Sequence, residues 1–463
     1  MKSLQKNGKL FRKKGTSNIN SKYYNKRMSN NLSIQIQKNK PTVVSLFSGC
    51  GGLDLGFKNA GFEIIWANDF DKDSVETYKR NIDNRIVHGD ITKISSSEIP
   101  KNADVLLGGF PCQSFSVANN KRDVKDKRNF LYKEMLRIIK DTQPKFFIAE
   151  NVKGILSLGN GKVIDMIIKD FNSIGYKVEK PFIINCAYYG VPQFRERVII
   201  MGNRINAPNT FPKITHKNGY KTPIPDFIKP EDYHNLPYVI SVKEAIEHLP
   251  EPNTPEGKNI PNHIGSNKVS GKYVARKNEI DQAEICDYLK TWRTKAKITT
   301  HKIDEILGYR HTAGHWFRKD ISGSIPSPKD WAKLKNILGF DNKYDRLVTE
   351  VEIRRIKFEQ SLRVTNWDRP SDTITASVPE IHINKKRRLT ARECAILQSF
   401  PNNFVFYGSL SSQHRQIGNA VPPLIGEHLA REIKKYIENT NPEKHWKELK
   451  MVNTTLIGGT YQY

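Results

Sequence analysis

Short apolar runs alternate with stretches of helical periodicity between Pro41 and Gly202, and this rhythm restricts the possible folds more than any other feature. Such alternation is typical of repeated strand–helix units that build a parallel sheet. Parallel strands buried on both faces read as continuous apolar runs, as these do. We therefore expect an α/β domain with a mostly parallel sheet. Its expected strands are residues 43–47, 63–67, 85–88, 104–107, 146–149 and 198–201, with helices at 74–81, 130–141 and 163–171.

The rhythm breaks after Gly202 and returns near Arg388. Residues 203–385 are rich in Pro, Asn and Lys and show few regular periods, which indicates a second, smaller and irregular domain. Thr390 and Glu393 match a capping box that begins a helix, and an amphipathic helix follows Pro423. The expected parts are a basic flexible arm at 1–40, a first domain at 41–202, the second domain at 203–385, a return to the first domain at 386–440 and a tail at 441–463.

The chain is strongly basic, with 75 Lys and Arg against 48 Asp and Glu and a formal charge of +27. This balance favours a polyanionic partner, with nucleic acid as the leading candidate. A basic enzyme without such a partner is the alternative. Residues 1–40 contain eleven Lys or Arg and no acidic residue, so the arm could add affinity for phosphates. Nothing in the arm indicates that it reads bases.

The five cysteines are scattered and form no CxxC pair. This pattern argues against a disulfide framework and against a zinc site, and it favours a reducing compartment. We expect no metal. The chain has neither an apolar run of the ~18 residues that span a bilayer nor a secretory signal, so the expected protein is cytoplasmic and not membrane-bound.

A glycine-rich segment, LFSGCGGLDLG at residues 46–56, follows the first expected strand and opens a helix. Glycines allow sharp turns and close approach of the backbone to a ligand. Asp69 lies 17 residues after Gly52, at the usual place for a carboxylate that holds ribose hydroxyls. Asp54 stands where a dinucleotide fingerprint has its third glycine. A nucleoside without a pyrophosphate, such as S-adenosylmethionine, therefore fits better than a dinucleotide, and a merely tight turn is the alternative.

Cys112 lies in the segment GGFPCQSFS, at the carboxyl end of an expected strand. Open α/β sheets place their sites at this edge. A lone cysteine is usually a small buried hydrophobic residue, but this one follows a proline among polar residues. We interpret it as a nucleophile, since a thiolate is a strong one.

Glu150, also at a strand end, is a candidate acid. Arg195 and Arg197 alternate on one side of an extended segment and could grip a phosphate or a base carbonyl, a charged strand edge being the alternative.

Taken in order, these segments resemble the DNA cytosine-5 methyltransferase family of bacterial restriction–modification type. The likeness rests on the glycine loop, Phe-Pro-Cys-Gln, Glu-Asn-Val, Gln-x-Arg-x-Arg and the later Gln-x-Gly-Asn-x-Val. It covers about 42–202 and 386–437. Methyltransferases acting on exocyclic amines carry Asn or Asp followed by Pro-Pro and an aromatic residue at the second loop, where this chain has Cys112.

The resemblance implies a Rossmann-like, S-adenosylmethionine-dependent catalytic domain and a target-recognition domain at 203–385. It also implies that Cys112 adds to C6 of a flipped-out cytosine in duplex DNA, which makes C5 reactive toward the methyl group. Glu150 would hydrogen-bond N3 and the exocyclic amine. Arg197 would contact O2, while Arg195 would support the loop or a phosphate.

Cofactor and DNA contacts are carried over from the family in the same way. The implied cofactor-binding residues are Phe47, Ser48, Gly49, Gly51, Leu53, Asp69, Phe70, Asp90, Ile91, Pro111 and Asn419. The implied DNA-binding residues are Gln113, Ser116, Lys121, Arg122, Gln193, Arg310, Arg318 and Arg363.

Two other functions remain open at this point. An RNA cytosine-5 methyltransferase would keep every catalytic motif, although the large 203–385 region favours DNA. A non-catalytic DNA-binding protein of the same fold is a second alternative, against which Cys112, Glu150 and both arginines argue. The expected assembly is a monomer, and the resemblance suggests a cognate restriction endonuclease acting on the same site.

Overall fold

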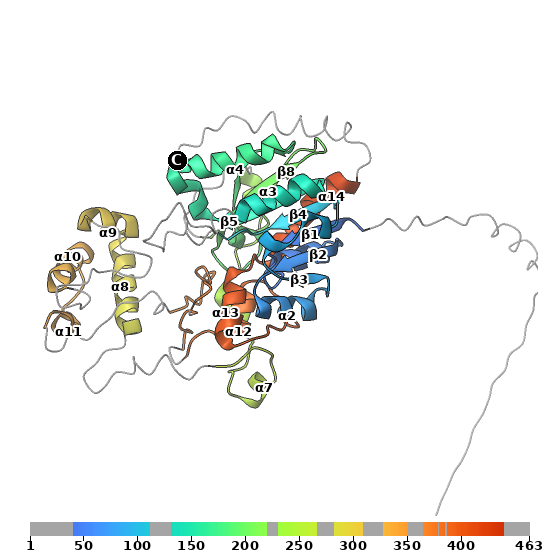
Figure 1. Ribbon diagram of the computed structural model, residues 1–463. Helices are drawn as coiled ribbons and strands as arrows, with labels where there is room; N and C mark the ends of the chain where they lie inside the picture. The colour runs from blue at the N-terminus through green and yellow to red at the C-terminus, as the bar shows by residue number, and fades with distance from the viewer. Residues whose placement is uncertain are drawn as a thin grey trace, which may run out of the picture. The chain divides into compact units, whose positions relative to one another are not determined.

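The computed structural model describes residues 40–111, 131–219, 230–265, 282–308, 327–350, 364–377, 379–384 and 387–438 (Figure 1). The arm before residue 40 and the tail after 438 lie outside this part of the chain. So do eight predicted site residues: Cys112, Gln113, Ser116, Lys121, Arg122, Arg310, Arg318 and Arg363.

A single mixed sheet forms the centre of the first domain, with strand order β3-β2-β1-β4-β5-β8-β6 and with β7 paired to β8. The five strands from β1 to β5 are parallel, whereas β8 is antiparallel to β5, β6 and β7. The predicted mostly parallel sheet is confirmed. The strands are β1 Thr42–Leu46, β2 Glu63–Asp69, β3 Ile86–His88, β4 Val105–Gly108, β5 Phe146–Val152, β6 Lys177–Val178, β7 Phe182–Asn185 and β8 Glu196–Asn203.

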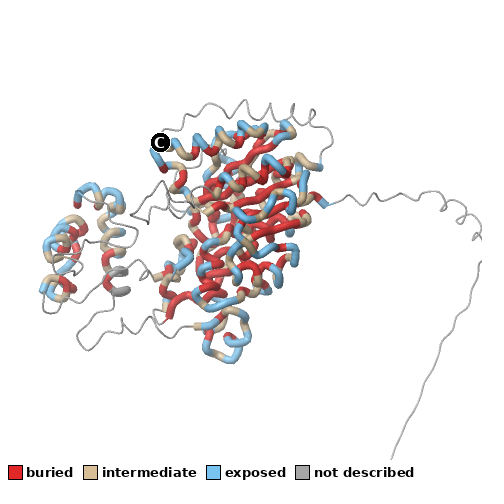
Figure 2. Tube along the Cα trace, in the orientation of Figure 1, coloured by how far each residue is buried: buried red, intermediate tan, exposed pale blue. Residues whose placement is uncertain are grey.

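Successive residues of each central strand contribute to two separate hydrophobic cores, one on each face of the sheet. In β1, Val43 belongs to one core and Val44 to the other; in β5, Ile148 and Phe147 divide in the same way. Helices cover both faces, which gives three layers. On the Val43 face pack α1 (Gly52–Asn59), α2 (Lys72–Asn81) and α14 (Pro423–Glu438). On the Val44 face pack α3 (Leu131–Thr142) and α4 (Lys162–Ser173). Figure 2 shows the buried residues, in red, concentrated in the sheet and on the helix faces that cover it.

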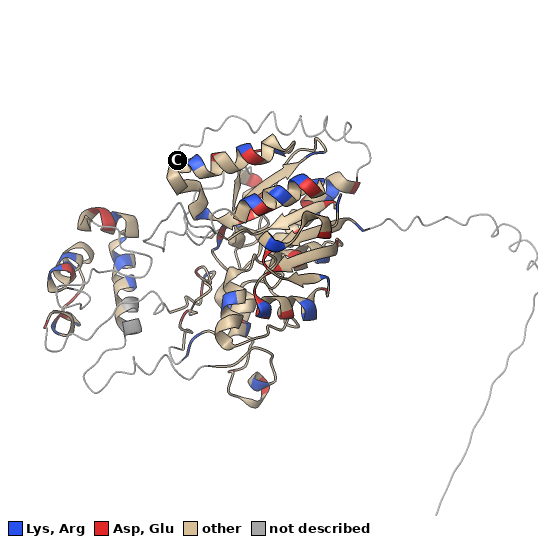
Figure 3. Ribbon diagram, viewed as in Figure 1, with Lys and Arg blue, Asp and Glu red and all other residues tan. Residues whose placement is uncertain are grey.

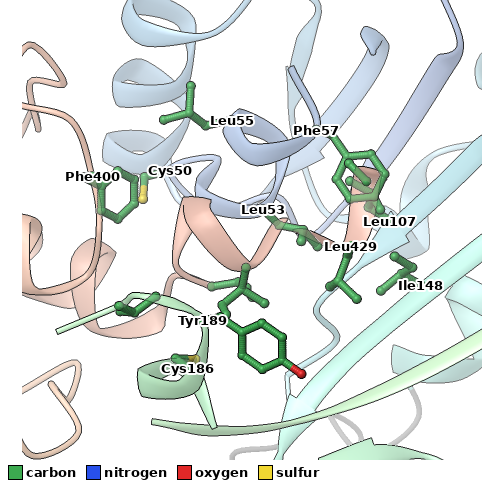
Figure 4. Close-up of a cluster of buried hydrophobic side chains, with 14 of the residues drawn as sticks. Cys50, Leu53, Leu55, Phe57, Leu107, Ile148, Cys186, Tyr189, Phe400 and Leu429 are labelled. Carbon is green, nitrogen blue, oxygen red and sulfur yellow. The ribbon is translucent and has the colours of Figure 1, made fainter. Parts of the chain in front are cut away.

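The last helix of the described chain, α14, returns to the first domain and packs closely on α1. A Cβ atom added at Gly56 would lie 2.2 Å from the Pro423 carbonyl oxygen, and one at Gly426 would lie 2.5 Å from the Leu53 carbonyl oxygen. Only glycine allows two helices to approach this closely. Figure 4 shows Leu53 of α1 beside Leu429 of α14 in the core that results.

The capping box predicted at Thr390 is confirmed, because Thr390 accepts from the Glu393 amide and Glu393 accepts from the Thr390 amide. It begins α12 (Ala391–Leu397), which is followed by α13 (Leu410–Asn419). Both helices pack into the core on the Val43 face.

The predicted domain bounds stay predictions, but the described part of 203–385 shows two features that the sequence pattern did not indicate. Ile214, Tyr233 and Val242 belong to the core of the first domain, which therefore extends well beyond residue 202. The separate core of the second domain is helical, not irregular, and Trp331 and Leu289 lie at its centre. Pro, Asn and Lys between the helices obscured their periods. These helices are α8 Gln282–Ala296, α9 Thr300–Leu307, α10 Pro328–Leu338 and α11 Asp345–Thr349; three short ones, α5 Pro230–His234, α6 Val242–Ile246 and α7 Pro255–Lys258, precede them.

None of the helices in the described ranges is both long and apolar enough to cross a bilayer. The same ranges contain no group of three or more His, Cys, Asp or Glu side chains arranged to hold a metal ion.

Candidate active site

The candidate site lies at the carboxyl edge of the parallel strands, where the direction of winding reverses. From β1 the chain proceeds to β2 and β3 on one side of the sheet, whereas β4 and β5 lie on the other. Open α/β sheets bind ligands at this switch point. The glycine loop follows β1, the Phe-Pro-Cys loop follows β4, and Glu150 lies near the end of β5.

The glycine loop has a backbone that most residues could not adopt. Gly49 and Gly51 have φ values of 56° and 89°, and Phe47 shares the left-handed region at 54°. A Cβ atom on Gly51 would lie 2.0 Å from Ile82 Cδ1, so the loop is pressed against the end of α2. A Cβ atom on Gly49 would meet no atom within 4 Å. The loop therefore packs tightly against α2 at Gly51 and leaves open space at Gly49, which suits close approach of a nucleoside.

Asp69 holds the glycine loop in place. Its carboxylate accepts one hydrogen bond from the Gly49 amide and one from the Asp71 amide, both 2.8 Å long. Burial raises the pKa of this carboxyl above its usual value. Asp69 thus joins the two loops that the sequence assigns to the cofactor, and Phe70 beside it exposes 76% of its surface.

The other predicted cofactor residues divide between surface and core. Asp90 is exposed, and its hydrogen bond from the Thr92 amide lowers its pKa. Asn419 is also exposed. Ile91 and Leu53 are 3% and 7% exposed, so they pack beneath the loops and present little surface to a ligand. Phe47, Ser48, Gly49 and Pro111 are partly buried, whereas Gly51 is buried.

Asp54 is a fully buried acid beneath the glycine loop. Tyr78 donates a hydrogen bond to it over 3.0 Å, yet burial raises the pKa of Asp54 to about 6. Asp54, at the position where a dinucleotide-binding loop has its third glycine, therefore has a structural role, because it binds Tyr78 of α2.

Glu150 and Arg197 form a buried ion pair at the end of β5 and the start of β8. Arg197 Nε lies 2.7 Å from Glu150 Oε1, and the two side chains are 10% and 11% exposed. The antiparallel register of the two strands brings them together. Burial raises the pKa of Glu150, while Arg197 opposes that shift. The Glu150 carboxyl therefore keeps its proton to a higher pH than a free carboxyl does.

The loop that carries Cys112 begins beside this pair. A Cβ atom on Gly109 would lie 3.3 Å from Glu150 Oε2, and Asn151 donates to the Phe110 carbonyl over 3.1 Å. Phe110 is buried against the ring of Tyr132. Asn151 lies within the Glu-Asn-Val motif, but the sequence alone did not indicate this role for it. Cys112 follows Pro111 directly in the chain and lies outside the described residues.

Three other cysteines are buried, free thiols that do not suit nucleophilic chemistry. Burial raises the pKa of Cys186 to about 12 and raises those of Cys50 and Cys394 well above the usual value of a thiol. Since the thiolate is the nucleophile, these side chains are inert near neutral pH.

Gln193 and Arg195 are fully buried, which does not fit the predicted contacts with DNA. Gln193 accepts from the Ile374 amide and donates to the Gln398 side chain, so its amide group is occupied within the protein. Arg195 donates to the carbonyl oxygens of Ile374, Gly418 and Ala420. Of the two roles considered for Arg195, its contacts favour support of neighbouring segments, because no surface is left for a phosphate.

Comparison with known proteins agrees with this geometry. A family model of C-5 cytosine-specific DNA methylases matches residues 41–435. Type II methyltransferase M.NgoFVII of Neisseria gonorrhoeae is 36% identical over 418 residues, 88% of this chain and 89% of that protein. Type II methyltransferase M.FnuDI of Fusobacterium nucleatum is 33% identical over 414 residues, 88% of this chain and 98% of that protein.

A solved E. coli structure, described as a prophage-encoded DNA modification methyltransferase, is similar in fold. It has a TM-score of 0.52 and 22% identity, and the match covers 86% of this chain and all of that one.

The winding of the sheet and the site at its switch point define a Rossmann-like methyltransferase fold. The chain belongs to the C-5 cytosine-specific DNA methylase family. The predicted family and the predicted enzyme class, DNA (cytosine-5) methyltransferase, are therefore confirmed.

Proposed function

We propose that this enzyme transfers a methyl group from S-adenosyl-L-methionine to C5 of a cytosine flipped out of a short, specific duplex sequence, through a covalent bond between Cys112 and C6. The observation that carries the proposal is the buried Glu150–Arg197 pair beside the start of the Cys112 loop. Its carboxyl and guanidinium groups would suit recognition of the polar edge of a cytosine.

The proposed reaction has three steps: addition of Cys112 to the ring, methyl transfer to C5, and elimination. The Cys112 thiolate forms a bond to C6, and the electron pair of the C5–C6 double bond becomes available at C5. When bound, the sulfonium donor would supply a methyl group to C5, and the electron pair of the broken S–CH3 bond would stay on sulfur, leaving S-adenosylhomocysteine. Loss of the C5 proton to a base and departure of the thiolate then restore the double bond. Covalent catalysis of this kind divides one difficult step into easier ones.

Glu150 and Arg197 have separate tasks in this scheme. Glu150 donates a hydrogen bond to N3 and accepts one from the exocyclic amine, which stabilises the charge that develops as C6 is attacked. Arg197 donates to O2 and at the same time fixes the orientation of Glu150. Asn151 holds the backbone at Phe110 and so positions the start of the nucleophile loop.

The glycine loop and the neighbouring strand ends fit the donor. Phe47, Ser48, Gly49 and Gly51 would border the donor, with open space at Gly49. Asp69 would take the ribose and Phe70, with its exposed ring, would stack on adenine. Asp90 would accept from the adenine amine. Ile91 and Leu53 support these loops, and Pro111 and Asn419 complete the wall.

Duplex DNA is the proposed substrate, and base flipping is required because C5 and C6 cannot be reached inside a stack. In the second domain, α8 carries Arg293 and Lys295 in its last turn, and Figure 3 shows basic positions along this helix. Lys295 lies over the ring of Trp292. Aromatic and basic groups interleaved in this way suit nucleic acid. Base or phosphate contacts by Gln113, Ser116, Lys121, Arg122, Arg310, Arg318 and Arg363 remain predictions.

A restriction–modification setting is the proposed biological context, supported by relatives that are named Type II methyltransferases. In this setting the enzyme is a cytoplasmic monomer that protects DNA from a cognate endonuclease cutting the same sequence.

Incubation with tritiated S-adenosylmethionine and either duplex DNA or transfer RNA tests the substrate class. We expect label in duplex DNA, recovered as 5-methylcytosine after digestion, and none above background in transfer RNA. Label in transfer RNA alone would establish the RNA alternative. Sequence-specific DNA binding without label in either nucleic acid would support the non-catalytic alternative.

A further inference from the structure

A buried cluster of three polar side chains, Gln193, Arg195 and Gln398, joins parts of the chain that are far apart in sequence. All three are completely inaccessible to solvent. Gln193 and Arg195 lie immediately before β8, and Gln398 lies at the end of α12. Buried polar groups are costly unless they are hydrogen-bonded, so their contacts should identify what the cluster holds.

One set of contacts fixes the segment 417–420. Arg195 donates to Gly418 O over 2.7 Å and to Ala420 O over 3.0 Å. Gln398 donates to Ile417 O and to Ala420 O, each over 2.9 Å. Four hydrogen bonds from two side chains thus hold three backbone carbonyl groups at the end of α13, on either side of the predicted cofactor residue Asn419.

The same segment lies directly against the glycine loop. A Cβ atom on Gly52 would lie 2.2 Å from Val421 O and 3.2 Å from Ala420 Cβ. Cys50 Sγ lies 3.6 Å from Gln416 O. A displacement of 417–420 would therefore be transmitted to the loop proposed to border the donor.

A second set of contacts holds the segment 371–374, which returns from the second domain. Arg195 donates to Ile374 O over 2.9 Å, and Gln193 accepts from the Ile374 amide over 3.0 Å. Ser371 pairs with Gln193 in a parallel bridge. A Cβ atom on Gly418 would lie 2.2 Å from the Thr375 backbone, so the returning segment and the wall at 417–420 are in contact.

We propose that Gln193, Arg195 and Gln398 form a positioning clasp that holds the cofactor wall at 417–420 in register with the strand that carries Arg197. The proposal rests on the function proposed above and names residues that act on the donor through the backbone. Arg197 lies two residues after Arg195 in the same extended segment, so one clasp places the donor wall relative to the group proposed to bind the base.

Arg195→Lys tests the clasp, because lysine keeps the charge but cannot reach three carbonyl oxygens with a planar fork. Arg392→Lys is the matched control: Arg392 is also fully buried and also donates to three carbonyls, those of Pro261, Pro401 and Phe404. Both variants are expected to lose similar thermal stability. Arg195→Lys should weaken binding of S-adenosylhomocysteine to the protein about tenfold, measured by calorimetry, and raise KM for the donor by a similar factor. Arg392→Lys should leave both near wild type.

Gln398→Met provides a second, milder test, with Gln413→Met as its control. Gln413 lies in α13 but donates to Gly408 O and accepts from Asn262, so its hydrogen bonds do not include the carbonyl groups of 417–420. Equal donor affinities in clasp and control variants would overturn the clasp. Failure of the wild-type protein to bind S-adenosylhomocysteine would instead overturn the proposed function, so the two failures are distinguishable.

Discussion

Cys112→Ala is expected to abolish methyl transfer, with a fall in rate of at least about 10⁴-fold, while duplex DNA is still bound. The reason is chemical: without the thiolate no bond forms at C6, and C5 of a neutral cytosine is too poor a nucleophile to take the methyl group. Transfer is measured as tritium incorporated into DNA, and binding as retention of labelled duplex by the protein.

Cys394→Ala is the control for this variant, since it removes a thiol that is buried and whose pKa is far above neutrality. It should cost about 1 kcal/mol of stability and leave transfer intact. Transfer at the wild-type rate by Cys112→Ala would remove the covalent mechanism from the account.

Glu150→Gln is expected to lower kcat by about 10²- to 10⁴-fold, the usual contribution of a positioned acid. Burial raises the pKa of Glu150, so the carboxyl holds its proton to a higher pH than a free one. The protonated form is the donor to N3, and the rate should therefore fall as the pH rises through this raised pKa. Glutamine donates without titrating, so the variant should lose that alkaline limb.

Glu196→Gln is a neighbouring control, because Glu196 pairs with Lys153 at the surface and is 43% exposed. Exposed ion pairs contribute little, and the change in kcat should stay within about twofold. An alkaline limb that persists unchanged in Glu150→Gln would assign that limb to another group.

The central fold could be predicted from the sequence because its signal is local. Val43 and Val44 are both apolar since each faces a different covered side of the sheet, and a run of such residues identifies a buried parallel strand. The capping box at Thr390 was equally readable, as its partners are three residues apart. β6 and β7 are edge segments of only two and four residues, too short to stand out from the sequence, and they were not predicted.

The candidate site was predicted in part, and the missing part depends on distant contacts. Glu150 and Arg197 each stood out in a motif, but their pairing follows from the antiparallel register of β5 and β8. Gln193 and Arg195 resembled surface residues because their side chains are polar. Their partners, Ile374 and Gln398, lie 179 to 205 residues away, and no local pattern indicates such burial.

The predicted boundary at residue 202 does not coincide with the edge of the first hydrophobic core, for a related reason. Ile214 and Val242 pack on the core of the first domain although the chain between them lacks the strand–helix rhythm. The periodicity of apolar residues identifies strands and helices. Whether an irregular segment packs on a core depends on single apolar residues, which have no periodicity.

Duplex DNA in which the cytosines of one strand are replaced by 5-fluorocytosine gives the most direct measurement. Fluorine at C5 cannot leave as a proton does, so the protein should remain bonded to the strand when S-adenosylmethionine is present. We predict a complex that survives denaturation, carries one added methyl group by mass, and maps to the peptide containing Cys112. Absence of this complex, under conditions in which unsubstituted duplex is methylated, would contradict the account.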